Sequence, residues 1–189
     1  MVYLNGYGKR QIVIFSSDTF CFDCHYYIDK DGFVIQKHSL HYDVTLNIPE
    51  NIFIHHGITP RNLSSGIVAI SLKNYGALVK KNDDFYQKRF VIEALKIKPA
   101  YPYEYCTKAK WRNEQYWDGY TTKQLESMEE LLQSLCRNLN ITKTYNPDIW
   151  DVSRRALMGT AGIFCHCSFR NDVSDPHPQI ELVNMLKAL

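Results

Sequence analysis

The segment 66–72, Gly-Ile-Val-Ala-Ile-Ser-Leu, constrains the fold more than any other part of the chain. An apolar run without regular polar positions is typical of a strand buried on both faces, as at the centre of an α/β sheet. Shorter apolar runs over 11–15 and 163–167 predict two further strands. Together these runs predict an α/β fold in which a central mixed sheet is flanked by helices.

A tight turn at Asp31-Gly32 predicts a hairpin between strands over 24–29 and 33–36, because Asp-Gly is a strong signal for such turns. The segment that follows is interpreted as a loop with room for a short strand over 41–46. A further strand-like run is predicted over 51–57, where apolar residues precede two histidines and a glycine.

The clearest helix begins after Thr121, because Thr121 and Gln124 have the spacing of a capping box and leucines then recur on one face. Pro178 predicts the first turn of a final amphipathic helix. Residues 79–118 mix aromatic residues with lysines, and we interpret them only as strands or loops laid over the surface.

The chain has 189 residues, 45% of them hydrophobic and 22% charged, so we expect one globular domain over residues 1–189. A net charge of +2 predicts neither a nucleic-acid partner nor binding to a charged membrane surface. The N-terminus lacks the pattern of a signal peptide, and no run has the length of a membrane span. We therefore expect synthesis in the cytoplasm, with action outside the cell only after release or export by another route.

The cysteines form two close groups, Cys21-x-x-Cys24 and Cys165-x-Cys167, besides two isolated residues. A zinc site with ligands from both groups is one interpretation, although the second spacing is not that of a zinc finger. Buried thiols in a reducing compartment are the interpretation that we favour for most of them. If the strand continues through Cys167, both cysteines of the second group face one side and His166 faces the other.

His166 and Asp175 are the first candidates for a functional site. His166 ends an apolar run, and Asp175 follows a short polar loop and precedes prolines at 176 and 178. If the loop folds back, an imidazole and a carboxylate meet, and such a pair suits zinc. The alternative is a polar pair that only stabilises the turn.

Several segments in order resemble the type-2 N-acetylmuramoyl-L-alanine amidases, the family that includes phage lysozyme-type amidases and the peptidoglycan recognition proteins. The most specific are His-Tyr-Tyr-Ile-Asp-Lys-Asp-Gly at 25–32 and the segment from His166 to Asp175-Pro-His-Pro at 175–178. The resemblance covers most of the chain and is weakest over 79–118. It implies an amidase fold and activity on the bond between muramic acid and L-alanine in peptidoglycan.

The resemblance also implies a zinc ion held by two histidines and a cysteine or aspartate, with a bound water as nucleophile. His166 and Asp175 match two of these ligand positions. Phe15 stands where the family has its first histidine, and a phenyl ring cannot bind a metal. Cys24 and Ser71 stand at the positions of the family's catalytic tyrosine and glutamate.

Further departures and matches affect the ligand groove. Val173 replaces the family's lysine, whereas His55, His56 and Asn74 are candidates for substrate binding. Trp111 and Trp117 either cap the core or stack on sugar. His25, in the middle of a strand, is more typical of a hydrogen-bonded core histidine.

Three functions remain open at this point. In the first, which we favour, the protein binds muropeptide with weak or lost amidase activity and with zinc weakened or absent. In the second, it is an active zinc amidase with a substitute ligand, for which Cys24, His55 and His177 are candidates. In the third, the fold serves as an inactive adaptor for a protein partner, for example within a phage-like or secretion apparatus.

Overall fold

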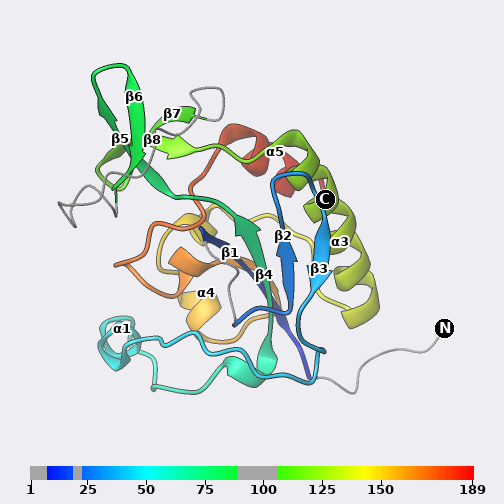
Figure 1. The fold of residues 1–189 in the computed structure, drawn as a ribbon. Coiled ribbons are helices and arrows are strands. Elements are labelled where there is room, and N and C mark those ends of the chain that lie inside the picture. The colour runs from blue at the N-terminus through cyan, green and yellow to red at the C-terminus, as the bar shows by residue number, and fades with distance from the viewer. Residues whose placement is uncertain (1–7, 19–22, 89–105) are drawn as a thin grey trace.

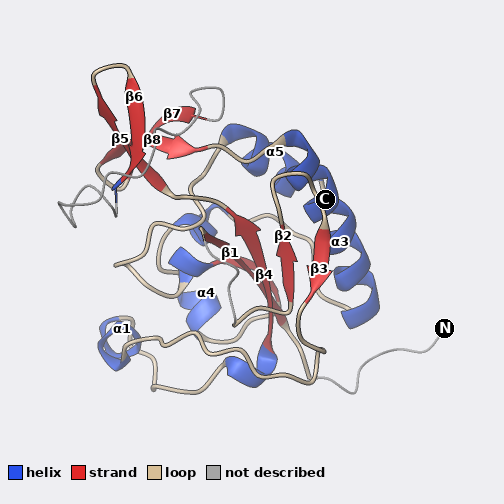
Figure 2. Cartoon of the chain, in the orientation of Figure 1, coloured by secondary structure: helices blue, strands red, loops and turns tan. Residues whose placement is uncertain are grey.

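A five-stranded mixed sheet, in the order β3-β2-β4-β1-β9, forms the centre of the fold (Figures 1 and 2). The computed structural model describes residues 8–18, 23–88 and 106–189. The strands of the sheet are β1 (Gln11–Ser17), β2 (Tyr26–Ile28), β3 (Val34–Gln36), β4 (Ile67–Lys73) and β9 (Gly162–Cys165). Strands β2, β4, β1 and β9 are parallel, and β3 is antiparallel to β2.

The central strands are apolar because both faces of the sheet are covered. In β4, every residue from Ile67 to Leu72 is buried, and β1 is buried from Gln11 to Ile14. Such strands form only where helices or loops lie over both faces. The predicted α/β fold with a central mixed sheet and flanking helices is confirmed.

Helices and short helical turns surround the sheet. Figure 1 shows α3 and α5 beside β2 and β3, with α4 on the opposite side of β4. The helices are α1 (Glu50–His55), α3 (Thr122–Leu139), α4 (Arg154–Leu157) and α5 (Ile180–Ala188), and the 3-10 turns are η2 (Ser64–Gly66), η4 (Pro147–Trp150) and η5 (His166–Ser168). The predicted capping box is present: the Thr121 hydroxyl accepts from the Gln124 amide, and the Gln124 side chain accepts from the Thr121 amide.

A second, antiparallel sheet in the order β6-β5-β8-β7 lies beyond the carboxyl end of β4 (Figure 1). Its strands are β5 (Ala77–Lys81), β6 (Asp84–Gln87), β7 (Cys106–Trp111) and β8 (Glu114–Asp118). The sequence led us to expect only surface strands or loops over 79–118. The second sheet instead also has a buried side, because Trp117 and Phe85 are 1% and 2% exposed. Residues 89–105 lie outside the described part of the chain.

The prediction of a strand over 51–57 is wrong, because these residues form helix α1 and its end. Ile52 and Phe53 are buried while Ile54 is 66% exposed, which is not the alternation of a strand. Pro49 begins the helix, and Gly57, with φ of +65°, follows its end. The short strand allowed over 41–46 is also absent, since these residues form a loop.

Strand β9 ends at Cys165, two residues earlier than predicted, and the chain turns into η5. The expected alternation of Cys165 and Cys167 around His166 therefore does not apply, although both thiols are buried. Cys24 and Cys136 are buried too, whereas Cys21 lies outside the described residues. Within the described ranges, no helix is both long enough and apolar enough to cross a membrane.

Candidate functional site

The His166–Asp175 pair lies at the carboxyl edge of the parallel strands. His166 directly follows β9, and β1 runs beside β9 with Ile14 opposite Cys165, so Phe15 is level with His166. Loops after parallel strands meet at this edge, which is where open α/β sheets bind ligands. The local sequence thus brings a histidine and the end of β1 to one point.

The two side chains contact each other directly. His166 Nδ1 lies 3.0 Å from Asp175 Oδ1 and 3.1 Å from Asp175 Oδ2. The backbone N–H of Ser16 donates to Asp175 Oδ2 at 3.1 Å, which fixes the carboxylate against the end of β1. The side chains of His166 and Asp175 are 17% and 24% exposed, so solvent and ligands reach this pair.

The phenyl ring of Phe15 packs on the imidazole of His166, with 4.6 Å between the ring centroids. Phe15 thus stands beside the pair, where the resemblance places a third zinc ligand. Among residues 8–18, 23–88 and 106–189, no three His, Cys, Asp or Glu side chains are grouped so that they could hold a metal. Since catalytic zinc sites use three protein ligands, the described residues do not fit a zinc ion.

Cys24 is buried and lies apart from the pair. It lies shortly before β2, which is separated from β1 by β4, so two strand spacings of about 5 Å each intervene. The neighbouring His25 donates its backbone N–H to Ala69, whereas Phe15 is level with Ser71. Cys24 is therefore also displaced along the strands by roughly three residues, or about 10 Å.

Ser71 is on β4, where it lies opposite Phe15 of β1 and opposite Tyr27 of β2. The three residues therefore form a row across the sheet. Its hydroxyl is buried and has no hydrogen-bond partner in the described part of the protein. Burial also raises the pKa of Tyr27 to about 12, with Asp29 adding to the effect.

The three residues proposed for substrate binding have different surroundings. His55 is exposed and His56 half-buried at the end of α1, with 5.3 Å between their ring centroids. Asn74 is only 2% exposed. Its side chain donates to the Asp118 carbonyl at 2.7 Å and accepts from the Gly76 amide at 2.8 Å, so it is bonded within the fold.

His177 is buried between two aromatic rings and does not reach the pair. It stacks on Trp117 at 5.0 Å and on Tyr120 at 4.8 Å, and neither ring nitrogen has a hydrogen-bond partner among the described residues. Burial lowers the pKa of His177 to about 3, and the charge of Lys30 adds to this effect. Trp117 therefore packs in the interior, which agrees with the interpretation that it caps the core.

Tyr120 is a site residue that the sequence did not reveal. Its hydroxyl lies 3.1 Å from Ser16 Oγ and accepts from the His177 amide at 3.2 Å, which ties the segment after Asp175 to the end of β1. Burial raises the pKa of Tyr120 well above its ordinary value. In the sequence, Tyr120 is marked only by its position directly before the helix cap. That position predicts a helix boundary but does not reveal the contact with β1.

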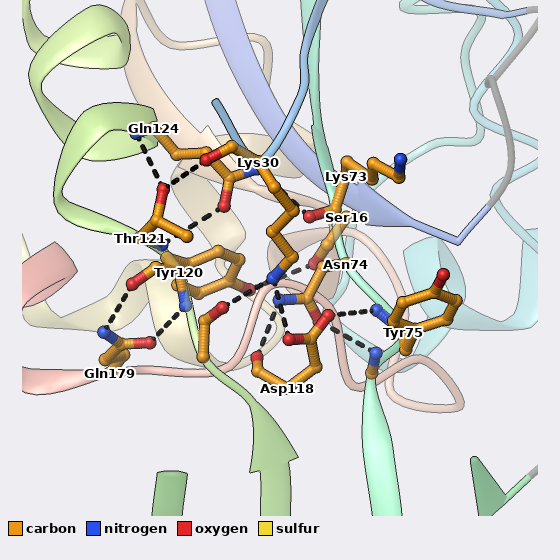
Figure 3. Close-up of polar contacts among 12 residues, drawn as sticks. Ser16, Lys30, Lys73, Asn74, Tyr75, Asp118, Tyr120, Thr121, Gln124 and Gln179 are labelled. Atoms are coloured by element: carbon orange, nitrogen blue, oxygen red, sulfur yellow. Dashed lines mark hydrogen bonds and ion pairs between the residues drawn. The ribbon is translucent and has the colours of Figure 1, made fainter. Parts of the chain in front are cut away.

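The Lys30–Asp118 pair lies at the same edge and joins the two sheets (Figure 3). Lys30 Nζ donates to Asp118 Oδ1 at 2.7 Å and to the Gly119 carbonyl at 2.6 Å. The backbone N–H of Tyr75 donates to Asp118 Oδ2 at 2.7 Å. Asp118 is fully buried, and burial lowers the pKa of Lys30 while the Asp118 charge opposes the shift.

Comparison with known proteins identifies the family. A profile of the family N-acetylmuramoyl-L-alanine amidase matches residues 9–178. The chain belongs to this family. Membership supports a function directed at peptidoglycan, of the amidase type.

Among solved structures, the chain is similar to the N-acetylmuramoyl-L-alanine amidase LysC from Clostridium intestinale URNW. The two share 12% identity with a TM-score of 0.48, over 96% of this chain and 85% of LysC. No curated protein sequence matches the chain.

Proposed function

We propose that this family member binds peptidoglycan fragments at the carboxyl edge of its central sheet and has weak or no amidase activity. Family membership supports the ligand class. The partly exposed His166–Asp175 pair supports the location, because it is polar, held by hydrogen bonds and accessible to solvent.

The contact between Phe15 and His166 carries the proposal. A phenyl ring 4.6 Å from the imidazole occupies the side of the pair where an active relative requires a ligand. The imidazole instead bonds to Asp175, which leaves its second nitrogen for a ligand. In this proposal Ser71 and Cys24 keep the positions of the family's catalytic groups without their chemistry, because both are buried.

His55, exposed at the end of α1, and the half-buried His56 after it are proposed to contact the ligand from a second side. Asn74 contributes indirectly, since its amide holds the Asp118 carbonyl inside the fold. The candidate ligand surface thus combines side chains that solvent can reach with buried hydrogen bonds that stabilise the surrounding fold.

Calorimetric titration with a disaccharide-peptide muropeptide, with and without a chelator, tests this function. We expect binding that is unchanged by the chelator, and no released peptide by mass spectrometry. His166→Ala should weaken binding, whereas Asn138→Ala, an exposed position on α3, should not. Binding that requires metal, together with peptide release, would support the active zinc amidase instead, and a protein that binds no wall fragment but co-purifies with a partner would support the adaptor.

A further inference from the structure

A cleft next to the His166–Asp175 pair is not used by the function proposed above. It has a volume of about 440 Å³, which is within the range of small-molecule sites. One wall is the turn between β7 and β8, residues 112–114, and the other is the loop 171–174, with Asp151 between them. We call it the hairpin cleft. Because Ser174 precedes Asp175, the cleft continues the open edge of the central sheet.

Arg112 holds the two walls together. Its Nη1 donates to the Asn171 carbonyl at 3.0 Å and to the Val173 carbonyl, and its Nη2 lies 3.2 Å from Asp151 Oδ1. Arg112 and Asn113 have φ of +44° and +68°, the left-handed pair of a tight hairpin turn. The second sheet thus sets the position of the loop that carries Asp175, and the cleft has a fixed shape.

The charged groups of the hairpin cleft are already paired within the protein. Arg112 pairs with Asp151, Arg170 with Asp172 at 2.7 Å, and Lys88 with Glu114. An ionic ligand would have to compete with these pairs. A neutral polar ligand would not, because it needs only hydrogen bonds.

Hydrogen-bonding groups remain available on both walls. The side chains of Asn113 on one wall and of Asn171 and Ser174 on the other have no partner among the described residues. Amides and hydroxyls both donate and accept hydrogen bonds. Such a set complements vicinal hydroxyls, which also donate and accept.

We propose that the hairpin cleft binds the saccharide part of a peptidoglycan fragment, while the peptide part lies at the His166–Asp175 pair. This inference rests on the proposed function and adds a subsite built by the second sheet. Arg112 acts as a positioning residue, because it holds both walls and is itself bonded to backbone carbonyls.

The test compares a disaccharide-peptide muropeptide with the same stem peptide lacking sugar, by calorimetric titration. The double variant Asn113→Gly/Asn171→Ala removes two unpartnered amides, one from each wall, and glycine retains the left-handed turn at residue 113. We expect it to weaken muropeptide binding by about tenfold and to leave stem-peptide binding unchanged. The control Gln115→Ala removes a neighbouring exposed amide outside the cleft and should affect neither ligand.

Three outcomes would overturn the proposal. Equal affinity of wild type for the two ligands, or equal weakening of both by the double variant, would show that the cleft contacts no sugar, while the proposed function would stand. Binding of neither ligand by wild type would remove both. Circular dichroism of the double variant checks that its fold is retained, and Ser174→Ala provides a second, single-site variant with the same expected selectivity.

Discussion

The Lys30–Asp118 and His166–Asp175 pairs lie at the same edge of the central sheet and differ in how fully they are bonded. Asp118 is buried, and each of its carboxylate oxygens has a close donor. The second pair is partly exposed, and the bonds to Asp175 leave one nitrogen of His166 for other partners. The first pair therefore joins the two sheets, whereas the second has capacity for a ligand.

This difference shows why a charged pair at a sheet edge does not by itself identify a site. A buried charge needs its partners, because removing one leaves the other desolvated and uncompensated. A partly exposed pair depends less on its partners for stability, because water can replace them. Substitutions in the two pairs should therefore differ in their cost to stability.

Asp118→Ala should lower the free energy of unfolding by about 3–5 kcal/mol, because Lys30 is left without its carboxylate in a buried position. Chemical denaturation measures the loss. Asp172→Ala, which removes a 56% exposed carboxylate, is the matched control and should cost about 0.5 kcal/mol or less. Similar losses in the two variants would mean that the Lys30–Asp118 pair is not the structural joint described above.

Acidification should lower the stability of the protein through a third polar group that is buried and hydrogen-bonded, His25. Its Nδ1 accepts from the Ala69 amide at 3.0 Å and its Nε2 donates to the Tyr42 carbonyl at 3.1 Å, so the folded protein holds it neutral. Burial is the main cause that lowers its pKa from 6.5 to about 4, and the Lys9 charge adds to this.

Because unfolded His25 takes up a proton that the folded protein excludes, the free energy of unfolding should decrease as pH falls from about 6.5 to about 4. Urea denaturation at several pH values measures the slope. His25→Gln should reduce the slope, and Asn138→Gln, at an exposed position on α3 without a titratable group, should leave it unchanged. An unchanged slope in His25→Gln would assign the pH dependence to other groups.

Asp175→Asn should have the smallest effect on stability, about 1 kcal/mol or less, because the pair is partly exposed. It should nevertheless weaken muropeptide binding by about tenfold, since the imidazole of His166 loses its charged anchor. Asp31→Asn, at an exposed position outside the hairpin cleft, serves as the control for both measurements. A large stability loss without a change in binding would reverse the roles of the two pairs.

Most of the central sheet could be predicted because its strands are apolar on both faces. The runs around Val13, Ile70 and Phe164 are buried as expected. The second sheet could not, because its hairpin turn uses Arg112 in a left-handed conformation, where sequence rules expect glycine or asparagine. Helix α1 was mistaken for a strand because only Ile52 and Phe53 face the core, too short a pattern to show a period.

Part of the site could also be predicted from the sequence. His166 and Asp175 are close in sequence, and the resemblance marked both, so their meeting could be expected. The contacts of Tyr120 and Arg112 join segments that are 104 and 61 residues distant in the chain, at Ser16 and Val173. No local pattern encodes such contacts, because they depend on how the second sheet packs.

Zinc stoichiometry of the purified protein, compared between wild type and Phe15→His, tests whether Phe15 takes the place of a zinc ligand. If the ring of Phe15 fills the third ligand position, wild type should hold well under one equivalent of zinc, and Phe15→His should bind about one. Cys24→Ser should leave the wild-type value unchanged. One equivalent in wild type that is lost in Cys24→Ser, or no gain in Phe15→His, would show that Phe15 does not replace a zinc ligand.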